Sequence, residues 1–362
     1  MHNEQLFHDT IVREIRRQSS EMDISSTLSA SLLDFIYEHG LFKLFVPKKL
    51  GGHMAALPEA LRIFEDAAQV DGNLGWTVTI GSGGGYFAAY MPQAIMSKLF
   101  AHKKAVVAGS GYPSGIAKKV DGGYAVNGAW KYCSGSTHAT VFTVNCETEQ
   151  VNDTNHTEIR TMILLPDQVQ IIEDWQTFGL TATASHTIQA INVFVPDYMT
   201  FQVIEENNKL DDLIYRFSFQ HFAEASFAAV ALGIGRHFIE EAKSLAAQHK
   251  EAWEASHLNR YEFVTSLIEA EQHKLDQASA DFYKHMDSVW DRHAAYQTLS
   301  GEEWRDASRI CKHTSRTALT AAQHIFPYLG TNAIQQNAAI NQIYRDVHTA
   351  CQHTLLVSYD NE

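Results

Sequence analysis

The stretch Gly122–Ala139, GGYAVNGAWKYCSGSTHA, decides the fold. Glycines open it, and the pair Asn127-Gly128 is a strong hairpin signal among residues that alternate as in a strand. The pattern predicts a turn, a strand, a second turn and a second strand. In that second strand, Trp130 and Tyr132 are expected on one face, because successive side chains alternate. The strand ends at Ser134–Ser136, where a hydroxyl and backbone N–H groups become free to bind a ligand.

The composition is that of a globular protein that does not bind nucleic acid. Of 362 residues, 45% are hydrophobic and 19% are charged, which is enough to bury large cores. The formal net charge is −14, whereas binding nucleic acid requires clustered Lys and Arg. The sequence has no run of about 18 apolar residues and no apolar leader segment. We therefore expect no membrane span and a cytoplasmic location.

Cysteine and histidine do not form a metal-binding pattern. The four cysteines include no CxxC pair, and the 19 histidines include no HExxH or HxH pattern. Such patterns are the usual sequence signatures of zinc sites. We therefore expect free thiols, as in a reducing cytoplasm, and no metal.

The distribution of residue types divides the chain into three parts. Residues 1–104 carry apolar residues at helical spacing, with Gly and Pro at the breaks. Residues 105–206 contain short segments rich in Val, Ile, Thr and aromatics, which predict a β domain of about seven strands. Residues 207–362 contain four long helical patterns with short connections, typical of a four-helix bundle. The predicted fold class is therefore α+β and mainly α.

This order of helices, β domain and four-helix bundle resembles the acyl-CoA dehydrogenase fold. The resemblance extends along most of the chain in five segments: GLFKLFVPKKLGG (Gly40–Gly52), AAQVDGNLGWTVTIG (Ala67–Gly81), YPSGIAKKVDGGYAVNGAWKYCSGSTHA (Tyr112–Ala139), FGLTATASHTIQAINVFVPD (Phe178–Asp197) and YRDVHTACQH (Tyr344–His353). It implies an N-terminal helical domain, a middle β-barrel domain on the flavin side, a C-terminal four-helix bundle and a homotetramer.

Two departures favour the flavin-dependent, two-component monooxygenase branch of this family over its dehydrogenases. Dehydrogenases commonly carry a catalytic Glu in a Tyr-Glu-Gly-Thr segment, and the matching segment here has Leu329 at that position. Removing an α-proton from an acyl thioester requires a positioned base, which Leu cannot supply. The segment Ser256–Leu267 also lacks the Arg-x-x-Phe-Gly motif that anchors FAD. Reduced FMN is therefore the favoured cofactor, with FAD as the alternative.

The resemblance also implies roles for particular residues. Contacts to the flavin are expected from Trp130, Tyr132, Ser134, Gly135, Thr183 and Ser185. His353 matches a histidine near the flavin in the monooxygenase branch and is the main catalytic candidate. His138, just beyond the Ser-Gly-Ser turn, is a further catalytic candidate, and His348 is secondary to His353. His348 lies five residues before His353, so the two are offset by about 140° on a helix and need not serve one site.

The predicted function is hydroxylation of an aromatic or similar small molecule with reduced flavin and O₂. No GxGxxG motif lies between a strand and a helix, so we expect a separate NAD(P)H:flavin reductase as partner. Two alternatives stay open. One is a divergent FAD-dependent acyl-CoA dehydrogenase whose base is Glu224 or Glu240. The other is a non-catalytic protein of the same fold, since Leu329 and Gly81 stand where relatives carry catalytic residues.

Overall fold

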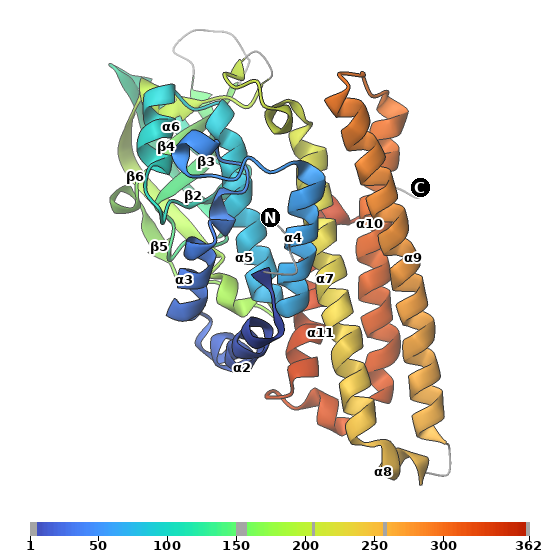
Figure 1. Cartoon of the computed structure of the whole chain (residues 1–362). Helices are drawn as coiled ribbons and strands as arrows, with labels where there is room; N and C mark the ends of the chain where they lie inside the picture. The colour runs from blue at the N-terminus through green and yellow to red at the C-terminus, as the bar shows by residue number, and fades with distance from the viewer. Residues whose placement is uncertain (1–5, 150–157, 205–206, 256–258, 360–362) are drawn as a thin grey trace.

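The computed structural model describes residues 6–149, 158–204, 207–255 and 259–359, so the start of the segment Ser256–Leu267 lies outside it. Figure 1 shows a sheet on one side of the molecule and the long helices of a bundle on the other, with α4 and α5 between them. The N-terminal helices are α2 (Asp9–Ser25), α3 (Ala30–Glu38), α4 (Leu57–Val70), α5 (Gly72–Gly83) and α6 (Gln93–Phe100).

Local sequence signals set the ends of α4 and α5. Pro58 lies in the first turn of α4, where its missing N–H costs no hydrogen bond. Asp71 ends α4 and caps α5, because its side chain accepts a hydrogen bond from Leu74 N at 3.0 Å. α5 is apolar or small on nearly every side and is buried along its length. It therefore lies between two other layers instead of on the surface.

The β domain is one seven-stranded sheet, which agrees with the number of strands expected from the sequence. The strands are β1 (Val107–Val120), β2 (Gly123–Cys133), β3 (Val141–Glu149), β4 (Glu158–Leu164), β5 (Gln170–Ile172), β6 (His186–Pro196) and β7 (Thr200–Phe201). Their spatial order is β5-β6-β2-β1-β3-β4-β7, and β1 and β3 run parallel. The sheet curls, because buried residues of β2, β4 and β6 share one apolar core.

The opening stretch turns at Asp121-Gly122 and again at Ser134–His138, after β2, but not at Asn127-Gly128. β1 and β2 are joined by a hairpin at Asp121-Gly122, where Gly122 has a φ of 72° that favours glycine. The second turn, predicted at Asn127-Gly128, is wrong, because β2 runs through these residues. Asn127 Oδ1 instead accepts a hydrogen bond from Asn192 N at 2.7 Å. A side chain at Gly128 would lie 2.7 Å from the Trp130 ring, so close packing explains this glycine.

α7 is the central helix of the bundle. The C-terminal helices are α7 (Phe219–Gln248), α8 (Lys250–Glu254), α9 (Arg260–Ala294), α10 (Gly301–Ile325) and α11 (Ala339–Ala350). A side chain at Gly233 would lie 2.2 Å from the Glu65 carbonyl oxygen, so this glycine permits the close approach of α7 to α4. α7 is long and apolar enough to cross a membrane, but 94% of its most apolar window is buried inside the protein. It is therefore a core helix.

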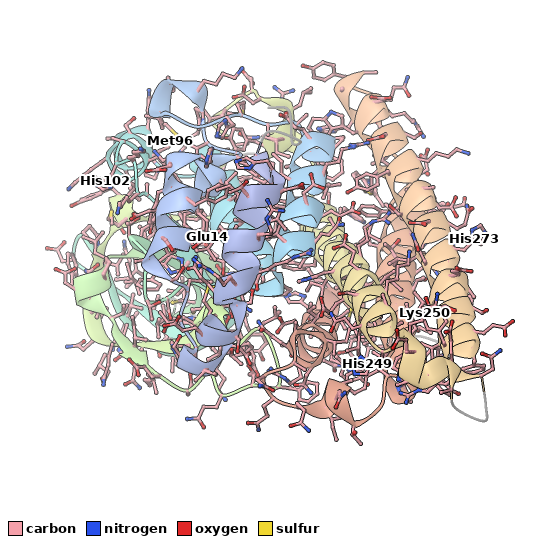
Figure 2. The ribbon with its side chains drawn as sticks, turned by 60° about the horizontal axis from the view of Figure 1, so that its bottom comes forward. Glu14, Met96, His102, His249, Lys250 and His273 are labelled. Carbon is pink, nitrogen blue, oxygen red and sulfur yellow. The ribbon has the colours of Figure 1, made fainter. Side chains whose placement is uncertain are left out.

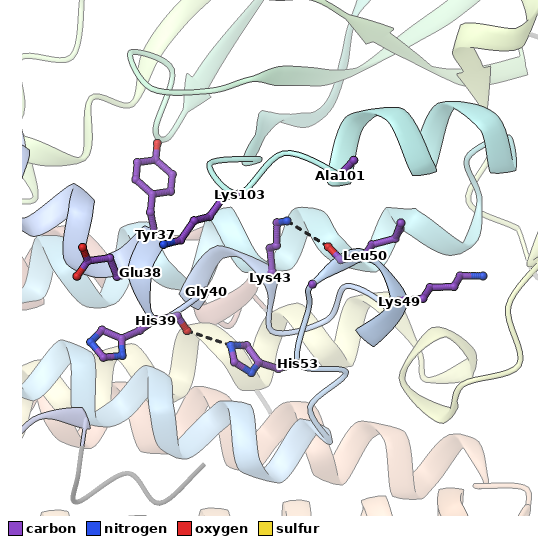
Figure 3. A pocket seen from close by; sticks show the side chains of 11 residues that line it. Tyr37, Glu38, His39, Gly40, Lys43, Lys49, Leu50, His53, Ala101 and Lys103 are labelled. Atoms are coloured by element: carbon purple, nitrogen blue, oxygen red, sulfur yellow. Dashed lines mark hydrogen bonds between the residues drawn. The ribbon is translucent and has the colours of Figure 1, made fainter.

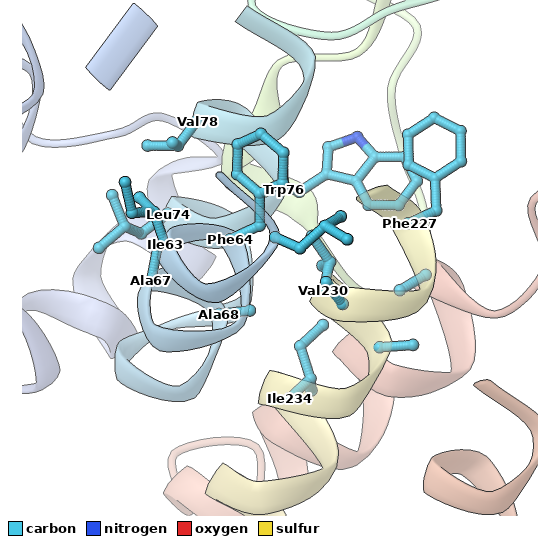
Figure 4. Packing of buried hydrophobic residues seen from close by; sticks show 14 of the residues in the cluster. Ile63, Phe64, Ala67, Ala68, Leu74, Trp76, Val78, Phe227, Val230 and Ile234 are labelled. Carbon is cyan, nitrogen blue, oxygen red and sulfur yellow. The ribbon is translucent and has the colours of Figure 1, made fainter. Parts of the chain in front are cut away.

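The outer faces of the helices are polar and the inner faces form one core. Glu14 on α2 and His273 on α9 are exposed (Figure 2). The apolar faces of α4, α5 and α7 meet in the interior, where Phe64, Trp76 and Phe227 pack (Figure 4). This junction places the bundle beside the loops that leave the sheet.

Candidate active site

The chain leaves β2 at a bulge. Trp130 and Cys133 are both buried in the core of the β domain, whereas Tyr132 has a φ of 65° and is 69% exposed. The pairing of β2 with β6 shifts register between Trp130 and Cys133. A bulge of this kind adds a residue and turns its side chain outward. The expectation that Trp130 and Tyr132 point to one face is therefore wrong.

Core packing accounts for Trp130. Its indole N–H donates to Asn145 O at 2.8 Å, and a side chain at Gly115 would lie 2.1 Å from its ring. The ring thus fills the interior of the β domain. Tyr132 instead lies on the surface, with its ring edge-on to Trp175 at 6.2 Å. Among the described residues, neither side chain hydrogen-bonds to the buried hydroxyl groups of Ser134, Thr183 and Ser185.

Two loops meet where β2 ends and β6 begins. In the second loop, Leu180 and Ala184 have left-handed φ values of 52° and 45°, and they enclose the short turn Thr181–Thr183. Gly135 N donates to Thr183 O at 2.8 Å, and Ser136 Oγ donates to Ala184 O at 2.7 Å. These bonds hold the two loops side by side.

A chain of hydroxyl groups joins the two loops to α5. Ser134 Oγ lies 2.7 Å from Ser185 Oγ, which lies 2.7 Å from Thr183 Oγ1. The Trp76 indole N–H donates to Ser134 Oγ at 3.0 Å. All four side chains are buried. The structure therefore brings together three residues that the resemblance associates with flavin, and it adds Trp76, whose role the sequence did not indicate.

Trp76 also connects the hydroxyl groups to His353. Its ring stacks on Phe227 of α7, with ring centroids 5.2 Å apart (Figure 4), and the Phe227 and His353 centroids are 4.2 Å apart. His353 Nδ1 accepts a hydrogen bond from Leu355 N at 3.3 Å, which leaves the proton of the neutral imidazole on Nε2. Burial lowers the pKa of His353 to about 4, so the ring is neutral at pH 7.

His138 and His348 pack against aromatic rings other than Trp76 and Phe227. The His138 ring stacks on Phe42 with centroids 5.6 Å apart, and its Nε2 is buried without a hydrogen-bond partner among the described residues. Burial lowers the pKa of His138 to about 4. His348 contacts Tyr344 and Phe178. It does not share the ring cluster of His353. The reason is not the predicted offset on one helix, because α11 ends at Ala350 and His353 lies beyond it in extended backbone.

Unpaired polar atoms on these elements fit a flat ligand with hydrogen-bonding groups. Besides His138 Nε2, the buried atoms without a partner among the described residues include Asn73 Nδ2, Thr77 Oγ1 and Thr79 Oγ1 of α5. Buried polar groups are normally hydrogen-bonded, so unpaired ones require an explanation. The edge of a flavin ring carries both donors and acceptors. The three α5 atoms lie on the helix that carries Trp76, which makes them candidates for hydrogen bonds to such a ligand.

The carboxylates considered for dehydrogenase chemistry are engaged elsewhere. Glu224 faces α10, where it accepts a hydrogen bond from Ser308. Glu240 is on the surface and pairs with Arg16 of α2 at 2.8 Å. In the described part of the chain, no contact joins either glutamate to Trp76 or to the hydroxyl groups of the two loops.

A surface hollow of about 500 Å³ lies outside this group of residues. The buried Lys43 borders it and donates to Leu50 O at 3.2 Å (Figure 3). Lys43 also donates to Phe100 O at 2.7 Å. Phe42, the preceding residue, contacts His138. The residues that line the hollow include neither Trp76, Ser134 nor His353, so the hollow is separate from the candidate active site.

Comparison with known proteins gives matches along most of the chain. The family model "Acyl-CoA dehydrogenase, C-terminal domain" matches residues 225–358. Indole-3-acetate monooxygenase of Acinetobacter baumannii is 25% identical over 356 residues, which cover 96% of this chain and 90% of that protein. The structure of 3-HSA hydroxylase from Rhodococcus sp. RHA1 has a TM-score of 0.87 at 18% identity and covers 98% of this chain and 93% of that chain. XiaF from Streptomyces sp., in complex with FADH2 and glycerol, has a TM-score of 0.79 at 17% identity and covers 96% and 89%.

These matches confirm the acyl-CoA dehydrogenase-like fold, with helical, β and bundle parts in the expected order. The relatives with curated names also confirm the class of protein that the sequence resembles. The chain is similar along most of its length to proteins named as monooxygenases, and these relatives indicate a flavin-dependent oxidoreductase.

Proposed function

We propose that this chain is the oxygenase component of a two-component system. It takes reduced FMN, or reduced FAD, from a separate NAD(P)H:flavin reductase and uses O₂ to hydroxylate an aromatic or similar small molecule. The observation that carries this proposal is the buried cluster of Ser134, Thr183 and Ser185 against Trp76, beside the neutral ring of His353. We also propose a cytoplasmic location and a homotetramer.

The bound flavin supplies the activation of O₂, and the chain binds the flavin, orients it and controls protons. Ser134, Thr183 and Ser185 contact it through their hydroxyl groups. The N–H of Gly135 is already bonded to Thr183 O, so Gly135 acts through its backbone conformation. A side chain at Gly135 would lie 3.0 Å from His138 Nε2, so the glycine avoids a close contact with that buried atom.

His353 and His138 differ in the hydrogen bonds that their ring nitrogens make. Phe227 packs against the half-buried His353, and Trp76 stacks on Phe227, so these rings shield part of the imidazole from water. Because Nδ1 of His353 accepts a backbone N–H, its Nε2 presents a proton. His353 is therefore suited to hold a proton near the reacting atoms instead of removing one from a substrate hydroxyl. His138 has no partner at Nε2, so its neutral ring remains free to bond substrate or flavin there.

The first experiment measures thermal stability with FMN, FAD and chemically reduced FMN, with and without oxygen excluded. A ligand that binds the folded state at 100 times its Kd adds about 2.7 kcal/mol, which is readily seen as a higher melting temperature. We expect selective stabilisation by reduced flavin. Stabilisation by oxidised FAD alone, together with reduction by an acyl-CoA, would favour the dehydrogenase alternative. No shift with any flavin would contradict both enzyme hypotheses.

The second experiment tests the histidines by turnover of phenols and indoles with an added flavin reductase. His353→Gln should lower turnover by roughly 10²- to 10⁴-fold, the usual contribution of a positioned proton donor or acceptor. His348→Gln is the matched control on the same segment, because His348 contacts Tyr344 and Phe178 instead. Equal activities of the two variants would refute the role of His353.

A further inference from the structure

The loop Gly179–Ser185 has a conformation that its own residues do not favour. Leu180 and Ala184 are both left-handed without being glycine, and such residues persist only where the surroundings hold them. Gly179 packs directly on α11, since a side chain there would lie 2.3 Å from backbone atoms of Arg345. The surroundings of this loop therefore decide where Thr183 and Ser185 lie.

Asp346 of α11 is the buried side chain that reaches this loop. It is 2% exposed, and its Oδ1 accepts a hydrogen bond from Leu180 N at 2.6 Å. Its Oδ2 would lie 3.1 Å from a side chain at Gly72, the first residue of α5. Asp346 thus lies at the junction of α11, the loop and the start of α5, the helix that carries Trp76.

We propose that Asp346 is a positioning residue that holds the loop Gly179–Ser185 in the conformation in which Thr183 and Ser185 meet the flavin. The proposal rests on the proposed function, since it assumes that flavin binds at these hydroxyl groups. Asp346 acts through Leu180 N–H and touches neither flavin nor substrate. A change at Asp346 should therefore alter flavin affinity without removing any group that contacts the flavin.

The charges around Asp346 give this role a dependence on pH. Burial, followed by the charge of the nearby Asp71, raises the pKa of Asp346 to about 8. Asp23 raises it further, while the Leu180 hydrogen bond and Arg345 lower it. Asp346 is thus protonated at pH 7. Because its folded-state pKa lies above the ordinary value of 3.8, its contribution to stability is lost progressively as pH rises from there through about 8.

The test measures the Kd of reduced flavin under anaerobic conditions for the full chain at pH 7 and pH 9. Ionised Asp346 still accepts the Leu180 N–H. Its charge would however lie buried beside Asp71 and Asp23, so we expect the junction to loosen and the wild-type Kd to rise roughly tenfold at pH 9. Asp346→Asn keeps the acceptor oxygen but cannot ionise. Its Kd for reduced flavin should equal that of wild type at pH 7 and should rise less than that of wild type at pH 9. Asp346→Leu removes the acceptor and should bind at least tenfold more weakly at both values.

A second readout does not require flavin. Amide hydrogen exchange of residues 180–185 in the flavin-free protein should be faster in Asp346→Leu than in wild type, and unchanged in Asp346→Asn. If wild type binds flavin and both variants bind it with the same Kd as wild type, the positioning role of Asp346 is refuted but the proposed function is not. No flavin binding by wild type would refute the proposed function as well. If Asp346→Leu does not fold, the pH dependence of wild type against Asp346→Asn decides the question.

Discussion

Acid should destabilise this protein through the buried ring of His353. The folded-state pKa is about 4, against 6.5 for an unperturbed imidazole. Because the unfolded chain binds the proton more readily, stability is fully present above about pH 6.5 and is lost as pH falls toward 4. Between pH 7 and pH 5 the loss from this one group is about 2 kcal/mol.

Other groups also titrate in this range, so the single-residue effect requires a difference between variants. His138 and His237 act in the same direction as His353, and Asp346 acts in the opposite one. Replacing His353 by Gln removes only its own contribution. Urea unfolding of the flavin-free protein at pH 7 and pH 5 should show that wild type loses about 2 kcal/mol more than His353→Gln.

The control variant is Val230→Ala, which removes buried methyl groups from α7 without changing any titratable group. It should lower the free energy of unfolding by a similar amount at both pH values. If His353→Gln loses as much stability between pH 7 and pH 5 as wild type does, the imidazole is not desolvated in the folded state and our reasoning about its neutral form is wrong.

Three further changes test the packing of the site. Gly179→Ala should destabilise the protein by about 1–3 kcal/mol in urea unfolding, because its side chain would meet backbone atoms of α11 at 2.3 Å; an unchanged midpoint would contradict this contact. Ser134→Ala leaves the buried Trp76 indole N–H unpaired and should cost about 1–3 kcal/mol, and less in a Trp76→Phe background. All four cysteines are buried, and burial raises the pKa of the Cys133 thiol to about 12, so a thiol reagent should label them only as the protein unfolds. Rapid labelling of the native protein would show that the thiols are not buried in the folded state.

Features that depend on local periodicity could be predicted from the sequence. The order of helices, sheet and bundle follows from spacing within short windows, and the structure has this order. The turn predicted at Asn127-Gly128 failed because the glycine is required by the neighbouring Trp130 ring, and because Asn127 bonds to Asn192, 65 residues away. A local turn signal cannot reveal a contact at that distance.

The candidate site shows the same limit. Ser134, Thr183 and Ser185 were predicted from the resemblance, and the structure brings them together. Tyr132 was misplaced because the bulge depends on how β2 pairs with β6. Trp76 and Phe227 were missed because aromatic residues at buried helix positions are indistinguishable from core residues in sequence. Only the packing of α5 against α7 gives them a position in the site.

The packing of α4 against α7 also has a consequence for how the chain is made in the cell. α4 ends at Val70, and its partner α7 begins at Phe219, after the whole β domain. At ~5–20 residues per second, the ribosome completes the intervening segment in on the order of ten seconds. Until then α4 can pack against α5, but the part of its apolar face that contacts α7 has no partner. The N-terminal helices and the bundle therefore form one late folding unit, and a chain released before α7 would expose α4 to chaperones and to aggregation.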